Sequence, residues 1–278
     1  MINSSVNRVE GCQDDGRAAS TPSGRPASTK ASPVNVVLLG ATRGIGRALA
    51  RLLAERGDRL CLLGRDPHEL ARSGADLEAR GASGRVLGVR CDLGDAQRFG
   101  PALDAAGAEL GRIDLVVLSA GAFGTQEQLE ADPALCQQVL DLDFTKAILF
   151  CEQARVRLLA GGGGTLCVFA SVAGDRARKP VALYGAAKAG LAHYLDGLDL
   201  RFRSGGLRVV TVKPGFVHTA MTDGLRPPPF AATPEAVAAC ALRGIARGRR
   251  VIYAPAIWRA LMTVICALPR PVLRRAAF

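Results

Sequence analysis

Tyr184 and Lys188 are the residues whose types and spacing first suggest chemistry. They stand at the two ends of Tyr-Gly-Ala-Ala-Lys, and on a helix side chains with this spacing project from one face, one turn apart. An ammonium group beside a phenol favours the phenolate, so Lys188 is expected to lower the pKa of Tyr184 from its reference of about 10 towards neutrality. Tyr184 could then give or take a proton. The alternative is an ordinary pair on a solvated helix face.

Such a pair needs a scaffold, and the sequence predicts one large α/β domain over residues 34–254. The chain has 278 residues, 49% of them hydrophobic, enough for a single large core. Apolar runs alternate with helix-compatible segments, which predicts a doubly wound parallel sheet with helices on both faces. The expected strands are 34–39, 59–63, 85–91, 113–118, 165–170, 207–212 and 250–253, and the expected helices are 45–56, 67–80, 95–110, 133–160, 181–203 and 233–247.

The first 33 residues differ from the rest in composition. They are rich in Ser, Thr, Pro, Gly and Arg without apolar periodicity, which predicts a disordered extension. They lack the apolar core of a secretory signal, and the acidic residues Glu10, Asp14 and Asp15 count against the alternative of an organelle presequence. A cytoplasmic protein is therefore expected.

Charge and cysteine usage narrow the function classes. The net charge is +11, but the arginines are spread along the chain without an aromatic-rich basic block, so no nucleic-acid partner is predicted. The eight cysteines show no Cys-x-x-Cys spacing; Cys61, Cys91 and Cys167 fall in apolar runs and are predicted to be buried thiols of a reducing compartment. The three histidines form no helix-spaced pair, so no metal site is expected.

A glycine-rich turn follows the first predicted strand. Gly40-Ala-Thr-Arg-Gly44-Ile-Gly46 opens a helix, which is the context that a pyrophosphate-binding turn requires. Gly40 permits the tight turn, Gly44 lets backbone amides approach the phosphates, and Gly46 lets helix and strand pack closely, so the phosphates would face a helix N-terminus. The alternative is a merely sharp strand-to-helix turn. The expected cofactor contacts in this turn are Gly40, Thr42, Arg43, Gly44, Ile45 and Gly46.

The ends of the next two strands bear on which dinucleotide binds. Arg65 follows Gly64 where an acidic residue would take the ribose 2′-hydroxyl of NAD, and an arginine there pairs with the 2′-phosphate of NADP. With Arg43 also near, we predict a preference for NADP(H), with NAD(H) as the alternative and Arg65 then an ordinary surface cation. Asp92 and Leu93 are expected to contact the cofactor. Asp92 would accept from the adenine amino group, or else cap the next helix.

The glycine turn, Ser171 and Tyr184-x-x-x-Lys188 together resemble the short-chain dehydrogenase/reductase family. The likeness covers about residues 34–254 and includes the serine thirteen positions before the tyrosine. It implies a Rossmann fold whose single domain carries both the cofactor site and the catalytic groups. The family's Pro-Gly after the sixth strand stands at Pro214, and by resemblance the backbone of Val217 and the hydroxyl of Thr219 would hold the nicotinamide carboxamide.

The resemblance also implies an activity, carbonyl reduction or its reverse by hydride transfer to and from the nicotinamide. Tyr184 would protonate the carbonyl oxygen, Ser171 would donate a hydrogen bond to it, and Lys188 would lower the tyrosine pKa and bind the nicotinamide ribose. Homodimers or homotetramers through helices 133–160 and 181–203 are implied as well. Two other hypotheses remain at this point, a soluble 3-oxoacyl reductase and a nucleotide-sensing regulator with a vestigial site.

Two positions depart from the family pattern. Ser119-Ala120-Gly121 replaces the usual Asn-Ala-Gly, so the asparagine brace is expected to be shortened or lost, while backbone contacts of Ala120 and Gly121 to the cofactor are retained. Asp143 stands where an asparagine usually joins the proton relay. An ionised carboxylate donates no hydrogen bond, so Asp143 is not included in the predicted catalytic set.

The last segments bear on the substrate. Residues 214–232 cannot form a regular helix at Pro227, Pro228 and Pro229. By resemblance this segment covers the substrate, and its apolar side chains Phe216, Met221 and Phe230 suggest an apolar ligand. The alternative is that these side chains only pack the segment onto the core.

Residues 255–278 form an apolar and basic carboxyl-terminal segment, with the expected membrane contact at 256–275, but its apolar run is too short to span a bilayer. Trp258 and the nearby arginines predict peripheral contact with the inner face of the cell membrane, and the alternative is docking on the chain's own domain or on a partner subunit. The tail and the preceding connection are also similar to bacterial decaprenylphosphoryl-2-keto-ribose reductases, which implies a lipid-linked keto-sugar as substrate.

Overall fold

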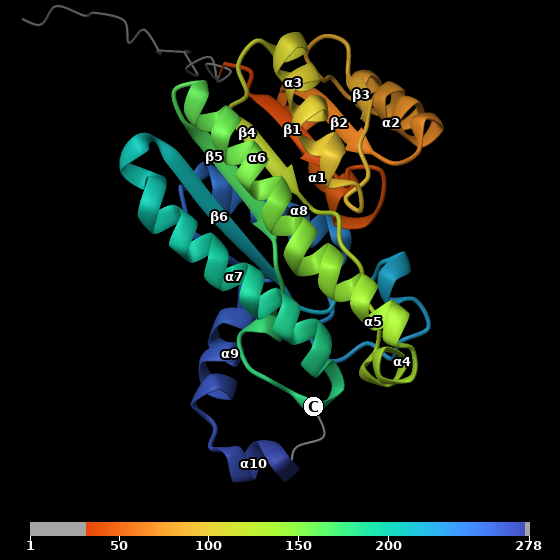
Figure 1. Cartoon of the computed structure of the whole chain (residues 1–278), viewed down its shortest axis with the longest axis vertical. Helices are drawn as coiled ribbons and strands as arrows, with labels where there is room; N and C mark the ends of the chain where they lie inside the picture. The colour runs from red at the N-terminus through yellow and green to blue at the C-terminus, as the bar shows by residue number, and fades with distance from the viewer. Residues whose placement is uncertain (1–31, 276–278) are drawn as a thin grey trace, which may run out of the picture. The chain divides into compact units, whose positions relative to one another are not determined.

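Seven parallel strands form one sheet in the order β3-β2-β1-β4-β5-β6-β7 (Figure 1). The computed structural model describes residues 32–275, so almost all of the expected disordered extension lies outside the described part. The predicted parallel sheet is confirmed. The strands are β1 (Asn35–Leu39), β2 (Arg59–Gly64), β3 (Leu87–Arg90), β4 (Leu115–Leu118), β5 (Gly164–Phe169), β6 (Leu207–Pro214) and β7 (Val251–Ala254).

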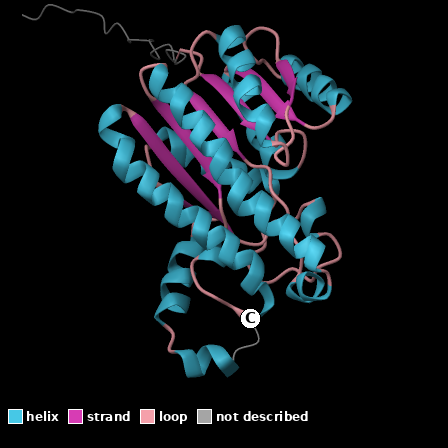
Figure 2. Cartoon of the chain, viewed as in Figure 1, coloured by secondary structure: helices cyan, strands magenta, loops and turns pink. Residues whose placement is uncertain are grey.

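Helices cover both faces of the sheet, as Figure 2 shows by colour. Alternate residues of β1 enter two separate cores, Val36 and Leu38 on one face and Val37 and Leu39 on the other, because successive side chains of a strand point to opposite faces. The first core is closed by α1 (Gly44–Arg56), α2 (Pro67–Ala79) and α8 (Pro234–Ala246), the second by α3 (Phe99–Leu110), α6 (Ala147–Ala160) and α7 (Ala182–Phe202).

The strand order reverses at β1, which has β2 on one side and β4 on the other. In open α/β sheets the ligand crevice lies beyond the carboxyl ends of the strands at such a reversal. The loops after β1, β4, β5 and β6 therefore meet at one edge. They carry the glycine turn, Ala120, Gly121, Ser171, Val217 and Thr219, while Tyr184 and Lys188 lie on α7. The predicted burial of Cys61, Cys91 and Cys167 is confirmed, and burial raises the pKa of Cys61 to about 12.

The helical run before β5 is interrupted. The sequence predicts one helix over 133–160, whereas the structure has α5 (Pro133–Leu140), a π-helical turn η2 (Asp141–Lys146) and then α6. Such turns are rare and concentrate at functional sites. A short helix not expected from the sequence, α4 (Gln126–Ala131), precedes this run and begins with a capping box of Thr125 and Gln128.

The carboxyl-terminal segment forms α9 (Ile257–Ala267) and α10 (Arg270–Arg275), which lie beyond the carboxyl ends of β5 and β6 (Figure 1). Trp258, Met262 and Ile265 of α9 are buried against Val172. The expectation that Trp258 faces lipid headgroups is therefore wrong, because the indole packs on the chain's own domain. Ile257 and Val264 on the outer side of α9 remain exposed. Within residues 32–275, no helix has both the length and the apolarity needed to cross a bilayer.

Candidate active site

Helix α7 presents Tyr184 and Lys188 one turn apart, as the spacing predicts. The Nζ atom of Lys188 lies 5.7 Å from the centroid of the Tyr184 ring, and the lysine is only 5% exposed. Ser171 follows β5 in an extended conformation; its hydroxyl accepts from the Ala173 amide at 3.1 Å and lies close enough to Tyr184 to lower the pKa of the phenol. The three residues predicted to be catalytic are thus brought together at the carboxyl edge of the sheet.

The distance between the serine loop and the tyrosine helix depends on Gly185. A Cβ atom at this position would lie 2.7 Å from the carbonyl oxygen of Ala173, closer than side chains approach backbone. The bare backbone at Gly185 therefore lets α7 pack directly on the turn that follows Ser171. On its other side the Tyr184 ring meets Phe123 edge to face, with centroids 5.0 Å apart.

The electrostatic balance at Tyr184 differs from the expectation. Burial is the largest influence and raises the pKa of Tyr184 above its usual value; Lys188 and Ser171 lower it, while Asp143 raises it. The prediction that Lys188 brings the tyrosine pKa towards neutrality is therefore wrong, because desolvation of the phenolate outweighs the neighbouring cation. The phenol keeps its proton at neutral pH and is poised to donate it.

Asp143 is the main residue of this site that the sequence reasoning left aside. The π-helical turn buries it to 1% exposure, and its Oδ1 accepts from Lys188 Nζ at 3.1 Å and from the Ala122 amide at 3.1 Å. Burial alone would lower the pKa of Lys188, but Asp143 and Tyr184 reverse this and raise it, so the lysine is a cation. The departure from asparagine is visible in the sequence, but the contact of Asp143 with Lys188 joins two separate helical segments and has no local sequence signal.

The turn after β1 is shaped for a dinucleotide. Arg43 stands at the N-cap of α1 and makes no side-chain capping bond, so no side chain at that position competes with a phosphate for the first amides of the helix. Gly40 has a φ of +99°, and a Cβ there would lie 2.5 Å from the Ala120 amide. Gly44 faces Thr219, whose methyl carbon would lie 3.4 Å from an added Cβ. The glycine turn and the loop after β6 therefore lie against each other, with bare backbone on one side and Thr219 on the other.

Ser119 still connects the ends of β1 and β4 by hydrogen bonds. Its hydroxyl lies 3.2 Å from the carbonyl oxygens of both Leu39 and Gly40, and the Ala120 amide donates to Leu39 at 3.2 Å. The brace between β1 and β4 is thus shortened, as expected, but it is not lost, because β1 and β4 are adjacent and the short side chain reaches across.

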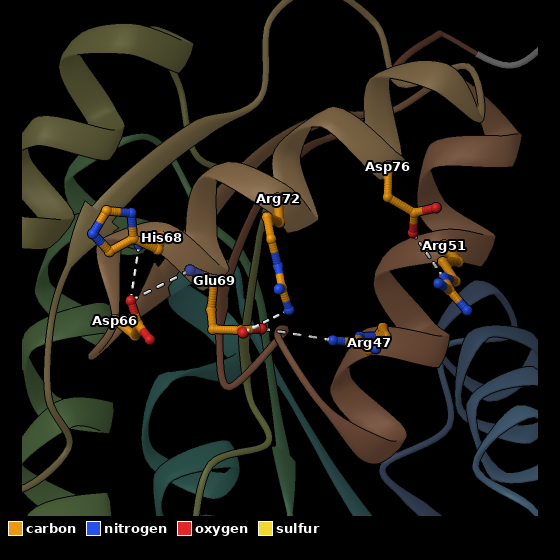
Figure 3. A network of polar contacts seen from close by, with 7 residues as sticks. All are labelled: Arg47, Arg51, Asp66, His68, Glu69, Arg72 and Asp76. Atoms are coloured by element: carbon orange, nitrogen blue, oxygen red, sulfur yellow. Dashed lines mark hydrogen bonds and ion pairs between the residues drawn. The ribbon is translucent and has the colours of Figure 1, made fainter.

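The acidic residues after β2 are occupied by local contacts. Asp66 caps α2 by accepting from the amides of His68 at 2.8 Å and Glu69 at 3.4 Å (Figure 3). Glu69 in turn forms ion pairs with Arg72 at 2.6 Å and with Arg47 at 3.9 Å. Asp66 thus caps α2 through Oδ1, and Glu69 is paired with two arginines.

Two arginines near the same place have no acidic partner. Arg43 and Arg65 are exposed and form none of the ion pairs found within residues 32–275.

Asp92 follows β3, and its Oδ1 accepts from the Gly94 amide at 2.9 Å. The alternative that Asp92 caps the next helix is wrong, because Asp95 fills that role by accepting from the Gln97 amide.

The loop after β6 is held by a residue that the sequence reasoning missed. The Thr222 hydroxyl donates to the Val217 carbonyl oxygen at 2.6 Å and accepts from the Thr219 amide at 3.2 Å. The threonine pair three residues apart was the available signal. Val217 also bridges Ala232 at the far end of the 214–232 segment, so both ends of the segment are pinned together.

The apolar residues between these ends do not pack onto the core. Met221 is 47% and Phe230 52% exposed, so the packing alternative is wrong for these two side chains. Phe216 is half-buried and meets His218 edge to face.

Comparison with known proteins agrees with this geometry. A family profile described as short chain dehydrogenase matches residues 34–229. An uncharacterized oxidoreductase of Mycobacterium tuberculosis is 36% identical over 247 residues, 89% of this chain and 98% of the relative. The cis-4-hydroxycyclohexanecarboxylate dehydrogenase of Sinomonas cyclohexanicum is 34% identical over 192 residues, 68% of this chain and 75% of the relative.

Solved structures share the fold. A short chain dehydrogenase from Burkholderia cenocepacia in complex with NADP has a TM-score of 0.76 at 22% identity, covering 88% of this chain and 98% of the other. A short chain dehydrogenase/reductase from Burkholderia phymatum in complex with NAD has a TM-score of 0.73 at 23% identity, covering 83% and 92%. On the family match and the identity of these relatives, the chain belongs to the short-chain dehydrogenase/reductase family.

Proposed function

We propose that the protein is an NADP(H)-dependent oxidoreductase that reduces a carbonyl to an alcohol, or catalyses the reverse reaction, with Ser171, Tyr184 and Lys188 as its catalytic residues. The observation that carries the proposal is the meeting of these three side chains at the carboxyl edge of the sheet, where the glycine turn also lies. The sequence alone implied the set by resemblance, and the geometry supports it.

The roles follow from the chemistry of the groups. When bound, the nicotinamide supplies hydride to the substrate carbon, and the carbonyl oxygen gains negative charge. Tyr184 donates its proton to that oxygen, and Ser171 donates a hydrogen bond to it. Lys188 compensates the phenolate that is left and holds the nicotinamide ribose. The raised pKa of Tyr184 favours this direction, because the tyrosine is present as the acid at neutral pH.

The cofactor preference rests on the unpaired arginines. Arg43 and Arg65 are exposed, and the carboxylate that follows Arg65 in the chain, Asp66, serves as the cap of α2. A 2′-phosphate would give both guanidinium groups a partner, whereas the ribose 2′-hydroxyl of NAD would leave both without one. The dehydrogenase name of the Sinomonas relative supports chemistry at an alcohol or its ketone.

The substrate that suits the entrance is apolar or lipid-linked. Met221 and Phe230 are exposed on the segment expected to cover it, and the outer side of α9 and α10 adds Ile257, Val264 and Val272. The exposed arginines of this surface are Arg259, Arg270, Arg274 and Arg275. An apolar stripe with a basic rim suits an anionic membrane surface, where a keto-sugar carried on a lipid phosphate would be presented.

We also place self-association on the outer side of α6 and α7. Leu149, Val156 and Leu200 are exposed on these helices, and a separate apolar groove at the start of α7 is lined by Leu140, Phe144 and Ala186. Burying these side chains against a second copy would form the homodimer, or half of the homotetramer, that the family resemblance implies.

The experiment that tests the function is a screen of ketones and lipid-linked keto-sugars, followed by nicotinamide absorbance with NADPH and with NADH. Tyr184→Phe should abolish turnover of any substrate found and still bind NADPH, because only the proton donor is removed. Tyr194→Phe is the matched control, since Tyr194 donates to Glu152 at 2.6 Å between α6 and α7. Undiminished turnover by Tyr184→Phe would contradict the assigned role.

A further inference from the structure

The π-helical turn at Asp141–Lys146 lies between α5 and α6, and Asp143 is its buried residue. Asp143 is 1% exposed and lies under the loop after β4, whose Ala122 amide donates to its Oδ1. Its Oδ2 is buried without a hydrogen-bond partner among residues 32–275. A buried carboxylate that is half unsatisfied costs stability, so its retention in this place calls for a role beyond packing.

The ionisable groups around Asp143 form a short array. Lys188 from α7 contributes the cation at 3.1 Å from Oδ1, and Tyr184 from the same helix contributes the phenol. Two uncharged groups adjoin this pair, the Ser171 hydroxyl near Tyr184 and the Phe169 carbonyl oxygen, 3.5 Å from Lys188 Nζ. One cation thus faces one fixed anion and one group that can become an anion.

We propose that Asp143 is a positioning residue that engages the charge of Lys188 and thereby keeps the proton on Tyr184. With Asp143 ionised, a phenolate at Tyr184 is the second anion facing a single buried cation. With a neutral side chain at position 143, the phenolate would be the only anion available to Lys188, and ionisation of the tyrosine would be favoured. Asp143 acts through Lys188 and touches no reacting atom.

The consequence is that Asp143 raises the pH up to which Tyr184 keeps its proton. A tyrosine that holds its proton is a standing acid for carbonyl reduction, and it becomes a base for alcohol oxidation only in alkaline solution. The direction of the Asp143 influence on the Tyr184 pKa, upwards, agrees with this. The inference deepens the proposed function, on which it rests for the identity of Tyr184 as the proton donor.

The test measures tyrosine ionisation without substrate or cofactor. The chain has three tyrosines, so alkaline titration of tyrosinate absorbance in the whole protein is simple, and the step missing from Tyr184→Phe belongs to Tyr184. In Asp143→Asn, which keeps an oxygen to accept from Ala122 and Lys188, that step should move to lower pH. Asp141→Asn removes a carboxylate from the same turn, on the side of the apolar groove, and should leave the step in place.

A purely structural role predicts a different result. If Asp143 only braces the loop at Ala122, Asp143→Asn will titrate like the parent protein, and the proposal is overturned. Asp143→Ser, a smaller neutral residue, guards against a folding defect peculiar to asparagine and must shift the step in the same direction. If the step shifts but no carbonyl is ever reduced, the electrostatic role stands and the proposed function fails. A shift to higher pH would overturn the opposing role of Asp143.

Discussion

The indole of Trp258 packs directly on Gly215, the residue that follows β6, where even a methyl group would overlap the ring. The same indole belongs to the buried cluster that contains Val172, the neighbour of Ser171. Helix α9 therefore touches both the loop of the proposed catalytic serine and the loop expected to hold the nicotinamide. The carboxyl-terminal segment is a structural part of the domain, whatever its outer side contacts.

Loss of the Trp258 side chain is expected to destabilise the protein. Trp258→Ala should cost about 3–5 kcal/mol in the free energy of unfolding, because it removes a large buried side chain and leaves a cavity. Ile257→Ala, the neighbouring residue at 46% exposure, should stay within about 0.5 kcal/mol. Denaturant unfolding monitored by far-UV circular dichroism measures both, and equal losses would show that α9 does not pack as described.

Arg65 should decide the cofactor preference. Arg65→Ala is expected to raise the KM for NADPH by about 10–100-fold, the loss of one charge-assisted hydrogen bond of about 1.5–3 kcal/mol, and to leave the KM for NADH nearly unchanged. Arg72→Ala is the control, because Arg72 is paired with Glu69 at 2.6 Å. An equal effect of Arg65→Ala on both cofactors would assign Arg65 to general surface charge.

The pH dependence follows from the sign of the Tyr184 shift. Reduction needs the phenol, whose pKa is raised, so kcat/KM for reduction should hold through neutral pH and fall only in alkaline solution. Oxidation needs the phenolate, so its kcat/KM should rise with pH over the same alkaline range. Profiles measured in both directions check this, and a loss of reduction at neutral pH would refute it.

Membrane contact by the outer side of α9 and α10 predicts salt-sensitive binding to vesicles. The whole protein should cosediment with vesicles containing anionic lipid and not with neutral ones. Replacing Arg270, Arg274 and Arg275 by Gln should weaken binding, and Val264→Glu should weaken it further, because both the charge and the exposed apolar contact are lost. Removal of the whole segment is a poor test, since it would expose Val172. Equal, negligible sedimentation of all variants would remove the membrane proposal.

Self-association predicts that the outer side of α7 is sensitive to charge. Leu200 is 70% exposed in the single chain, and Leu200→Glu should shift the protein to a smaller species in analytical ultracentrifugation, because a charge would be buried at the interface. Leu225→Glu, in the segment 214–232, is the control and should sediment like the parent. An unchanged distribution for Leu200→Glu would place the interface elsewhere.

Much of the candidate site was readable from local patterns. Alternation of apolar runs and helix periods predicted the seven strands within a few residues, because burial on both faces of a parallel sheet requires apolar runs. The turn from Gly40 to Gly46 and the pair Tyr184 and Lys188 could also be predicted from the sequence, because each depends on backbone geometry within a few residues.

What the sequence alone determined was which residues can do chemistry, and tertiary structure decided how strongly each is charged and what each contacts. The position of Asp143 against Lys188 joins residues from two helices and depends on a π-helical turn that has no local sequence signature. The raised pKa of Tyr184 and the burial of Trp258 likewise arise only when distant segments exclude water from a side chain. Desolvation is a property of the packed molecule, so a spacing rule that names two neighbours cannot supply it.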